Sequence, residues 1–372
     1  MKEEKLGKVG NERESNIELL RIVAIFFVVF SHFCVHSQFV FPTGALSLNQ
    51  ILVQMGAIGE IGVSIFILIT GFYSVKGKSS IKKIVYILIE VWLYNVIILI
   101  LTQLLSKDEL SFAMILKNIL PIYNTHWFVY TYMFLYALSP FINKLLINMD
   151  QNTYQKLLIM LWVSWGIVYT FTGADLNYSY LVWFIFVYMV GAYVRLYGSE
   201  KPNRVPNFLS FCICTCLMII STILIDIVGL RFGFYPQHGN HFYSLHSPLV
   251  LGIAFSLFQL FRGFKIKHNK FINMIAGTTL AIYLISDNTF VRLGLWNDVF
   301  KNGMHSDNHF LIFIGIIEVL IVCIVCATID IVRRKLFELK PLVKLMQAIC
   351  KMIERIFSFF SSVVWKLVQK VL

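Results

Sequence analysis

The sequence predicts an all-α, polytopic membrane protein with about ten transmembrane helices and a C-terminal amphipathic interfacial helix. Of its 372 residues, 58% are hydrophobic and only 14% are charged, whereas about a quarter of the residues in soluble domains are charged. Apolar stretches of about 20 residues recur along the chain, and each is long enough to cross a hydrocarbon core of roughly 30 Å. No soluble domain of useful size fits between them, so residues 17–332 form one transmembrane domain in this interpretation.

The first apolar stretch follows a mixed-charge head, residues 1–16, that carries no small-residue cleavage site. We therefore interpret this stretch as a retained helix and not as a signal peptide. From there the hydrophobic pattern predicts spans near residues 17–37, 52–74, 81–104, 127–148, 154–172, 179–197, 208–230, 243–262, 271–291 and 309–332.

The basic residues predict the orientation of these spans. If the N-terminus is cytoplasmic, the hairpins on its side of the membrane carry thirteen basic residues and those on the far side carry five. Since basic residues gather in cytoplasmic loops, both termini are expected in the cytoplasm. The net charge of +12 is scattered over short loops without a continuous basic face, so nucleic acid is not an expected partner.

Residues 333–372 predict a cytoplasmic tail. Their polar positions recur at mostly three- and four-residue intervals and leave a broad apolar face. An in-plane cationic helix on the anionic inner leaflet explains that pattern, whereas an eleventh span would bury Lys366 and Lys370. The seven cysteines all lie in apolar surroundings and do not have the convergent spacing of a metal site, so no metal is expected.

The first span holds the strongest chemical signal. Arg21 and His32 are eleven residues apart, which on a helix places them on one face and roughly 16 Å apart along the axis. Arg21 alone is equally explained as an anchor to phosphate headgroups. An imidazole in lipid needs a partner or a cavity, so His32 is either a hydrogen-bonded structural residue or a functional one.

An arginine, ten residues and a histidine in a first span resemble the signature of membrane-bound acyltransferase family 3. Four further stretches are similar in order. They are "GVSIFILITGFYS" (62–74), with Thr70 in a serine position, the Trp-led "HWFVYTYMFLYALSPFINKL" (126–145), the glycine-containing "YMVGAYVRLY" (188–197) ahead of a basic loop, and "TTLAIYLISDNTFVRLGLW" (278–296). The resemblance covers roughly residues 15–332. The chain departs from the pattern where residues 126–145 contain no glutamate, and where Ser286 stands in place of a frequent histidine, so those two roles are not assigned.

The resemblance implies an O-acetyltransferase of the bacterial plasma membrane. Such an enzyme moves an acetyl group from cytoplasmic acetyl-CoA to a hydroxyl of an extracytoplasmic or lipid-linked carbohydrate. We expect Arg21 to bind the donor, because a guanidinium binds phosphate bidentately. We expect His32 to act as general base, because imidazole exchanges protons near neutral pH. No fused hydrolase-like domain is expected to take part, so transfer would be completed within the membrane domain.

Other polar residues are also candidates, and three of them have a plainer explanation. Glu90 and His126 are further catalytic candidates, although Glu90 is also explained by pairing with another span. Arg195 and Thr70 are further donor-binding candidates, although the orientation rule explains Arg195 and close helix packing explains Thr70. Glu60 is a second carboxylate at membrane depth.

The competing interpretation is a transporter or flippase for a lipid-linked sugar, which would also have many spans and charged groups at depth. Such a protein is expected to show internal repeats with interrupted helices in both halves. The alignment of Arg21 with His32 on one helix face occurs only in the first span, so the sequence shows no such repeat. A membrane scaffold or sensor would have little use for an aligned arginine and histidine.

Overall fold

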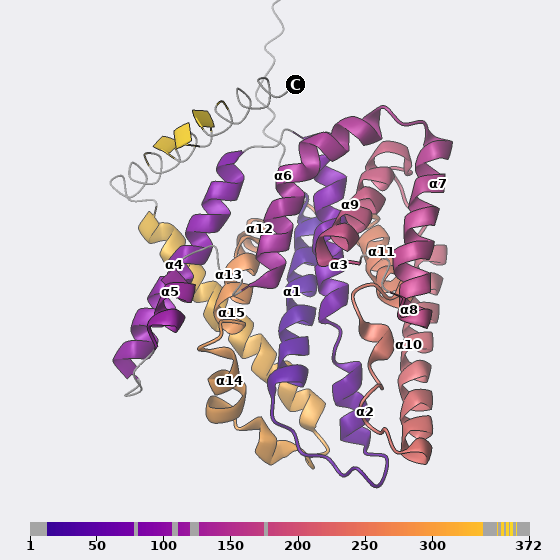
Figure 1. Cartoon of the computed structure of the whole chain (residues 1–372), viewed down its shortest axis with the longest axis vertical. Coiled ribbons are helices and arrows are strands. Elements are labelled where there is room, and N and C mark those ends of the chain that lie inside the picture. Colours follow the sequence, from indigo (N-terminus) through magenta and orange to yellow (C-terminus); the bar gives the residue numbers. More distant parts are fainter. Residues whose placement is uncertain are drawn as a thin grey trace, which may run out of the picture.

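The computed structural model describes residues 13–77, 81–105, 111–119, 126–174 and 178–337, together with eight further residues between 348 and 362. Within this part of the chain the structure is helical and contains no strand. The long helices run side by side in one bundle (Figure 1). The all-α prediction is therefore confirmed for the described residues.

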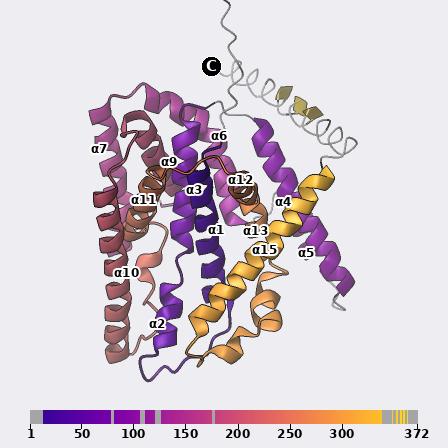
Figure 2. The same ribbon diagram turned by 180° about the vertical axis from the view of Figure 1, so that it is seen from behind.

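Four helices form the centre of the bundle: α1 (Ser15–His36), α3 (Gly59–Ser74), α9 (Tyr180–Tyr197) and α11 (Pro248–Arg262). Helix α3 packs against the other three (Figures 1 and 2). A Cβ atom on Gly71 would collide with the backbone of Tyr188 on α9, and one on Gly191 would collide with Leu68 on α3. Small residues at such crossings let two backbones approach closely. The close-packing interpretation of the Thr70–Gly71 segment is thus supported.

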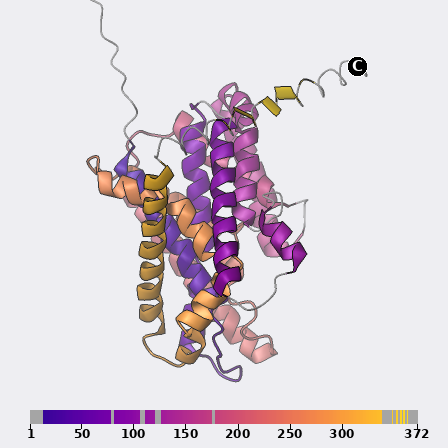
Figure 3. The ribbon, with the colours of Figure 1, turned by 90° about the vertical axis from the view of Figure 1, so that its left-hand side faces the viewer.

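The remaining helices surround this centre. They are α2 (Leu48–Met55), α4 (Ile81–Leu105), α5 (Phe112–Ile119), α6 (Trp127–Ile147), α7 (Gln151–Leu161), α8 (Tyr169–Thr172), α10 (Arg204–Phe232), α12 (Lys270–Gly277), α13 (Thr279–Ser286), α14 (Arg292–Gly294) and α15 (Leu311–Phe337). The short elements η1 (Trp162–Val168), η2 (His241–Tyr243), η3 (Leu295–Val299) and η4 (Asn302–His305) join or extend them. Helices α4 and α15 lie at the same edge of the bundle (Figures 2 and 3), where Arg333 of α15 forms an ion pair with Glu90 of α4.

Polar residues begin several of these helices. Asp150, Asn203 and Asn269 accept hydrogen bonds through their side chains from the first backbone N–H groups of α7, α10 and α12. Ser179 and Ser247 do the same for α9 and α11. Such N-caps satisfy N–H groups that have no partner inside the helix. The caps therefore explain locally why these helices begin where they do.

Two expected spans are broken. Helices α2 and α3 occupy the range expected as one span at 52–74, and α12 and α13 occupy the range expected at 271–291. At the second break the carbonyl of Gly277 accepts a hydrogen bond from the guanidinium of Arg334. A break at membrane depth is tolerated where neighbouring groups satisfy the freed backbone. Hydropathy alone does not reveal such breaks, because the residues on both sides remain apolar.

Six stretches among the described residues are helical, long and apolar enough to cross a membrane: Ser15–His36, Leu48–Ser74, Lys82–Leu105, Tyr180–Tyr197, Arg204–Phe232 and Leu311–Leu336. Two shorter apolar stretches, Pro248–Arg262 and Lys270–Ser286, accompany them. Helices also fill the expected fourth and fifth spans, as α6 and as α7 with η1 and α8. The protein is thus a multi-pass membrane protein, while the number of ten spans stays a prediction.

Hairpins that were assigned to one side of the membrane meet at one end of the bundle. At one end, the Asn16 side chain donates to the Phe261 carbonyl at 2.9 Å, and the Ser15 hydroxyl donates to Asn273 at 3.0 Å. At the opposite end, the Asn297 amide donates to the carbonyl of His36 at 3.0 Å. These contacts agree with the predicted grouping for the segments that they join, and the sidedness of the other loops stays a prediction. Which end faces the cytoplasm stays a prediction, and most of the predicted tail at 333–372 lies outside the described residues.

Candidate active site

A cavity of about 700 Å³ runs inside the bundle between α1, α3, α4, α6 and the α12–α13 pair. Glu18 and Arg21 line one end of it, and His32, His36 and Glu60 line the other. Enclosed pockets of this volume with a few convergent polar groups are typical of small-molecule sites. Arg21 and His32, which the sequence placed on one helix face, both line this single cavity.

Arg21 is only weakly held by its own helix. Its Nε atom lies 3.7 Å from Oε1 of Glu18, one turn earlier, and has no hydrogen-bond partner within the described part of the chain. A second cation, Arg13, lies 3.9 Å from the other oxygen of Glu18. Because 3.7 Å is too long for a hydrogen bond, the Nε–H of Arg21 remains available to donate to an anion in the cavity.

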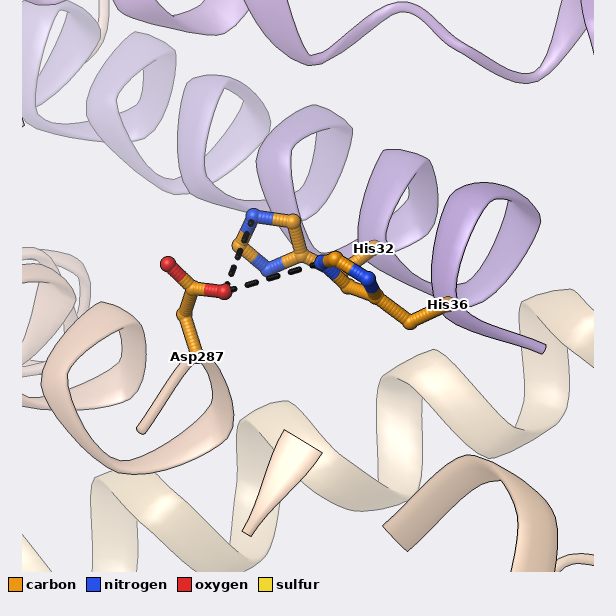
Figure 4. A group of neighbouring side chains, drawn as sticks. All are labelled: His32, His36 and Asp287. Carbon is orange, nitrogen blue, oxygen red and sulfur yellow. Dashed lines mark ion pairs between the residues drawn. The ribbon is translucent and has the colours of Figure 1, made fainter. Parts of the chain in front are cut away.

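His32 faces a carboxylate from a distant part of the sequence. Its Nε2 atom lies 3.9 Å from Oδ1 of Asp287, and Nε2 of His36 lies 3.7 Å from the same oxygen (Figure 4). Asp287 directly follows α13, whereas both histidines lie one turn apart on α1. These separations exceed a hydrogen bond but are short enough for strong attraction between charges in a poorly solvated site.

The three side chains also have the donor set of a metal site. One ligand atom from each of His32, His36 and Asp287 lies within 4.8 Å of the others, and imidazole with carboxylate is a common set for zinc. However, the guanidinium of Arg292 lies 3.6 Å from the same Asp287 oxygen. A fixed cation there already balances the single carboxylate and disfavours a divalent ion. The arrangement is better suited to proton transfer than to metal binding.

Glu90 lines the cavity but is already paired. Its Oε1 atom accepts a hydrogen bond from Arg333 of α15 at 2.8 Å, and Arg333 also contacts Asp330 at 2.6 Å. Arg334 binds the other oxygen of Asp330 at 2.6 Å. Asp330 is fully buried, so this network ties α4 to α15 within the bundle. The plainer explanation of Glu90, pairing with another span, matches this geometry.

His126 lies beside the cavity and not in its lining. The side chain is fully buried, and its Nε2 atom lies 3.1 Å from Oδ1 of Asn95. Its ring packs edge-to-face on Tyr283 at a centroid distance of 5.4 Å. Tyr283 in turn lies 6.3 Å from the ring of His32. His126 is therefore connected to the site through the ring of Tyr283.

The two other predicted donor-binding residues, Thr70 and Arg195, differ in their position relative to the cavity. Thr70 lines the cavity, where its hydroxyl donates to the Phe66 carbonyl at 2.8 Å. Arg195 lies outside the lining, with its guanidinium 5.0 Å from the centre of the Phe72 ring. The structure thus brings Arg21, His32, Glu90 and Thr70 to one cavity and leaves His126 and Arg195 beside it.

Sequence reasoning missed Asp287, although a signal was present. The residue ends the stretch "TTLAIYLISD", inside the span expected at 271–291, and intramembrane carboxylates are candidates by default. Ser286 itself is fully buried.

The comparison with protein families agrees with this geometry. A family model described as an acyltransferase domain matches residues 14–328, a range that begins just before α1 and ends within α15. Neither the curated proteins nor the solved structures contain a chain that matches this one. The matched range covers most of the chain and includes every residue of the site described above except Arg13 and those at the end of α15. The chain therefore belongs to membrane acyltransferase family 3 and is a multi-pass membrane acyltransferase.

Proposed function

We propose that this acyltransferase moves an acetyl group from cytoplasmic acetyl-CoA to a hydroxyl of an extracytoplasmic or lipid-linked carbohydrate. The observation that carries the proposal is that Arg21 and His32 line opposite ends of one cavity. One end offers a cation for a polyanionic donor, and the other offers a proton acceptor. The bacterial plasma membrane, with both termini in the cytoplasm, is the location that fits the distribution of basic residues.

Arg21 and Lys83 are the donor-binding cations in this proposal. Both line the cavity, and the Lys83 ammonium lies 4.7 Å above the ring of Tyr136. Arg334 also lines this end, but its guanidinium is occupied by Asp330 and the carbonyl of Gly277. Phosphate groups of the donor would bind Arg21 and Lys83, and the thin pantetheine arm would extend along α1 past Thr70 towards His32.

His32 takes the proton of the acceptor hydroxyl. The hydroxyl oxygen then forms a bond to the thioester carbonyl carbon, the carbon–sulfur bond breaks, and the proton passes from His32 to the departing thiolate of CoA. Asp287 stabilises the imidazolium that exists between these two proton transfers, because its carboxylate oxygen lies 3.9 Å from Nε2. Arg292 keeps this carboxylate close to charge balance before the reaction begins.

A covalent route uses the same residues. In it a ring nitrogen of His32 first bonds to the thioester carbonyl carbon, the carbon–sulfur bond breaks and CoA leaves as the thiol with the imidazole proton. The acceptor hydroxyl then displaces the imidazole from the acetyl group and returns its proton to His32. Incubation with labelled acetyl-CoA in the absence of acceptor separates the two routes, since only the covalent one leaves label on the protein.

The test of the proposed function is transfer of radiolabelled acetyl from acetyl-CoA by the purified protein, measured together with CoA release. The His32→Ala variant is expected to fold, bind CoA and transfer no acetyl. Retained transfer in this variant would discard the assignment of His32. Mass spectrometry of surface glycans from cells with and without the protein identifies the acceptor.

A further inference from the structure

A row of aromatic rings extends from His32 along the cavity to α6 and α9. Ring centroids lie 6.3 Å apart between His32 and Tyr283, 5.9 Å between Tyr283 and Phe128, and 6.2 Å between Phe128 and Trp127. Trp127 then lies 4.6 Å from Tyr180, which is 50% exposed. Tyr283, Phe128 and Trp127 all line the cavity. This ring wall therefore leads from the surface to the proposed general base.

Trp127 has a plainer explanation, which is the aromatic belt that membrane proteins place at the lipid boundary. A belt residue needs contact with the boundary only. Trp127 instead lines the internal cavity and packs between Phe128 and Tyr180. The belt therefore does not account for the side of Trp127 that faces the cavity.

Glu60 faces the same part of the cavity. It lies in the first turn of α3, where Gly59 packs against Ser31, the residue before His32. Its carboxylate lines the cavity, and its Oε2 atom is buried with no hydrogen-bond partner among the described residues. A buried carboxylate oxygen without a partner is unfavourable. The position in the first helical turn offsets only part of that cost, so Glu60 retains hydrogen-bonding capacity for a ligand.

We propose that Glu60 and the ring wall form the acceptor subsite of this enzyme. The Glu60 carboxylate accepts hydrogen bonds from two hydroxyls of one sugar, while the apolar face of the sugar ring packs on Trp127. A third hydroxyl of that sugar then points to His32. The ligand class is thus a pyranose that enters along Tyr180. The assignment rests on the proposed function, since it names the residues that hold the acceptor of that reaction.

Sugar binding by the purified full-length protein tests the subsite without using catalysis. The probes are methyl glycosides of glucose, galactose, mannose and N-acetylglucosamine, observed by saturation-transfer NMR. At least one of them is expected to give a signal in the parent protein that is lost in Glu60→Ala and in Trp127→Ala. Glu318→Ala removes a buried carboxylate on α15 outside the cavity lining, and Trp92→Ala removes a half-exposed indole on α4. Both of these matched variants are expected to keep the signal.

Acetyl transfer gives the second readout. In membranes that contain the native acceptor, Glu60→Gln is expected to raise the KM for the acceptor by at least about tenfold, as loss of a charged hydrogen bond predicts. CoA binding is expected to be unchanged. The proposal is overturned if no glycoside binds the parent protein, if Glu60→Ala and Trp127→Ala bind as the parent does, or if Glu60→Gln weakens CoA and acceptor equally. Failure of the proposed function has a different signature, namely absence of CoA binding and release while glycosides still bind through Glu60.

Discussion

The Nε2 atom of His32 lies 3.9 Å from the Oδ1 atom of Asp287. The two residues are far apart in the sequence: His32 lies on α1, and Asp287 directly follows α13. The packing of α13 against α1 brings them together. Because the distance is too long for a hydrogen bond, Asp287 acts on His32 mainly through its charge. The carboxylate is therefore placed to stabilise the histidine in its protonated form, which is the form a general base acquires during the reaction.

Asp287→Asn is expected to lower kcat for acetyl transfer by about 10- to 100-fold, because the neutral amide does not stabilise an imidazolium. Affinity for CoA is expected to stay the same. Steady-state transfer and CoA titration measure the two quantities. Asp298→Asn, which removes an exposed carboxylate on η3, is the matched control. A kcat for Asp287→Asn equal to that of this control would exclude the electrostatic role.

Arg21→Ala is expected to weaken CoA binding by about tenfold or more, the range expected for loss of a charge-assisted hydrogen bond. Arg21→Lys is expected to recover part of the affinity, because an ammonium keeps the charge but not the bidentate geometry. Calorimetric titration with CoA distinguishes the three proteins. Arg231→Ala, at the opposite end of the bundle, is expected to bind CoA normally. Equal affinity in all four proteins would mean that the Arg21 guanidinium anchors the helix to lipid instead.

The sequence predicted the helices well and their interruptions poorly. Hydropathy located α1, α4, α6, α9 and α15 to within a few residues, because an uninterrupted apolar run of membrane length leaves few alternatives. The breaks at Gly56–Ile58 and Thr278 depend on contacts with other helices, such as the hydrogen bond from Arg334 to Gly277. A pattern within one segment carries no information about such contacts.

The same distinction applies to the site. Arg21 and His32 were found because their spacing is local to one helix, and helical geometry fixes which residues share a face. Asp287, which faces His32, and Arg333, which binds Glu90, lie far from those residues in the sequence. Only tertiary packing reveals these two pairs. Glu90 was selected for its rarity in a span, which does not distinguish a reactive carboxylate from the partner of Arg333.

The Glu90–Arg333 ion pair is expected to stabilise the fold and not to take part in catalysis. Glu90→Gln is expected to lower the free energy of unfolding by about 1–3 kcal/mol, since it removes the carboxylate charge that lies 2.8 Å from the mostly buried Arg333 guanidinium. In the double variant with Arg333→Gln, the two losses are expected to be less than additive. Thermal unfolding in detergent measures the cycle. Additive losses, or a Glu90→Gln variant that is fully stable but inactive, would contradict this assignment and restore Glu90 as a catalytic candidate.

Gly71→Ala tests the close contact on which the cavity depends. The added methyl group would collide with the backbone of Tyr188 on α9, and a backbone carbonyl cannot move aside as a flexible side chain can. The methyl group therefore forces α3 away from α9. This is expected to lower the free energy of unfolding by about 1–3 kcal/mol, the range for overpacking in a tight interior. The variant is also expected to transfer acetyl more slowly, because α3 supplies Thr70 and Glu60 to the cavity. Gly44→Ala is the control, since no atom lies within 4 Å of the position that its Cβ would take. Equal melting temperatures for the two variants would show that α3 and α9 are not held at this distance in the folded protein.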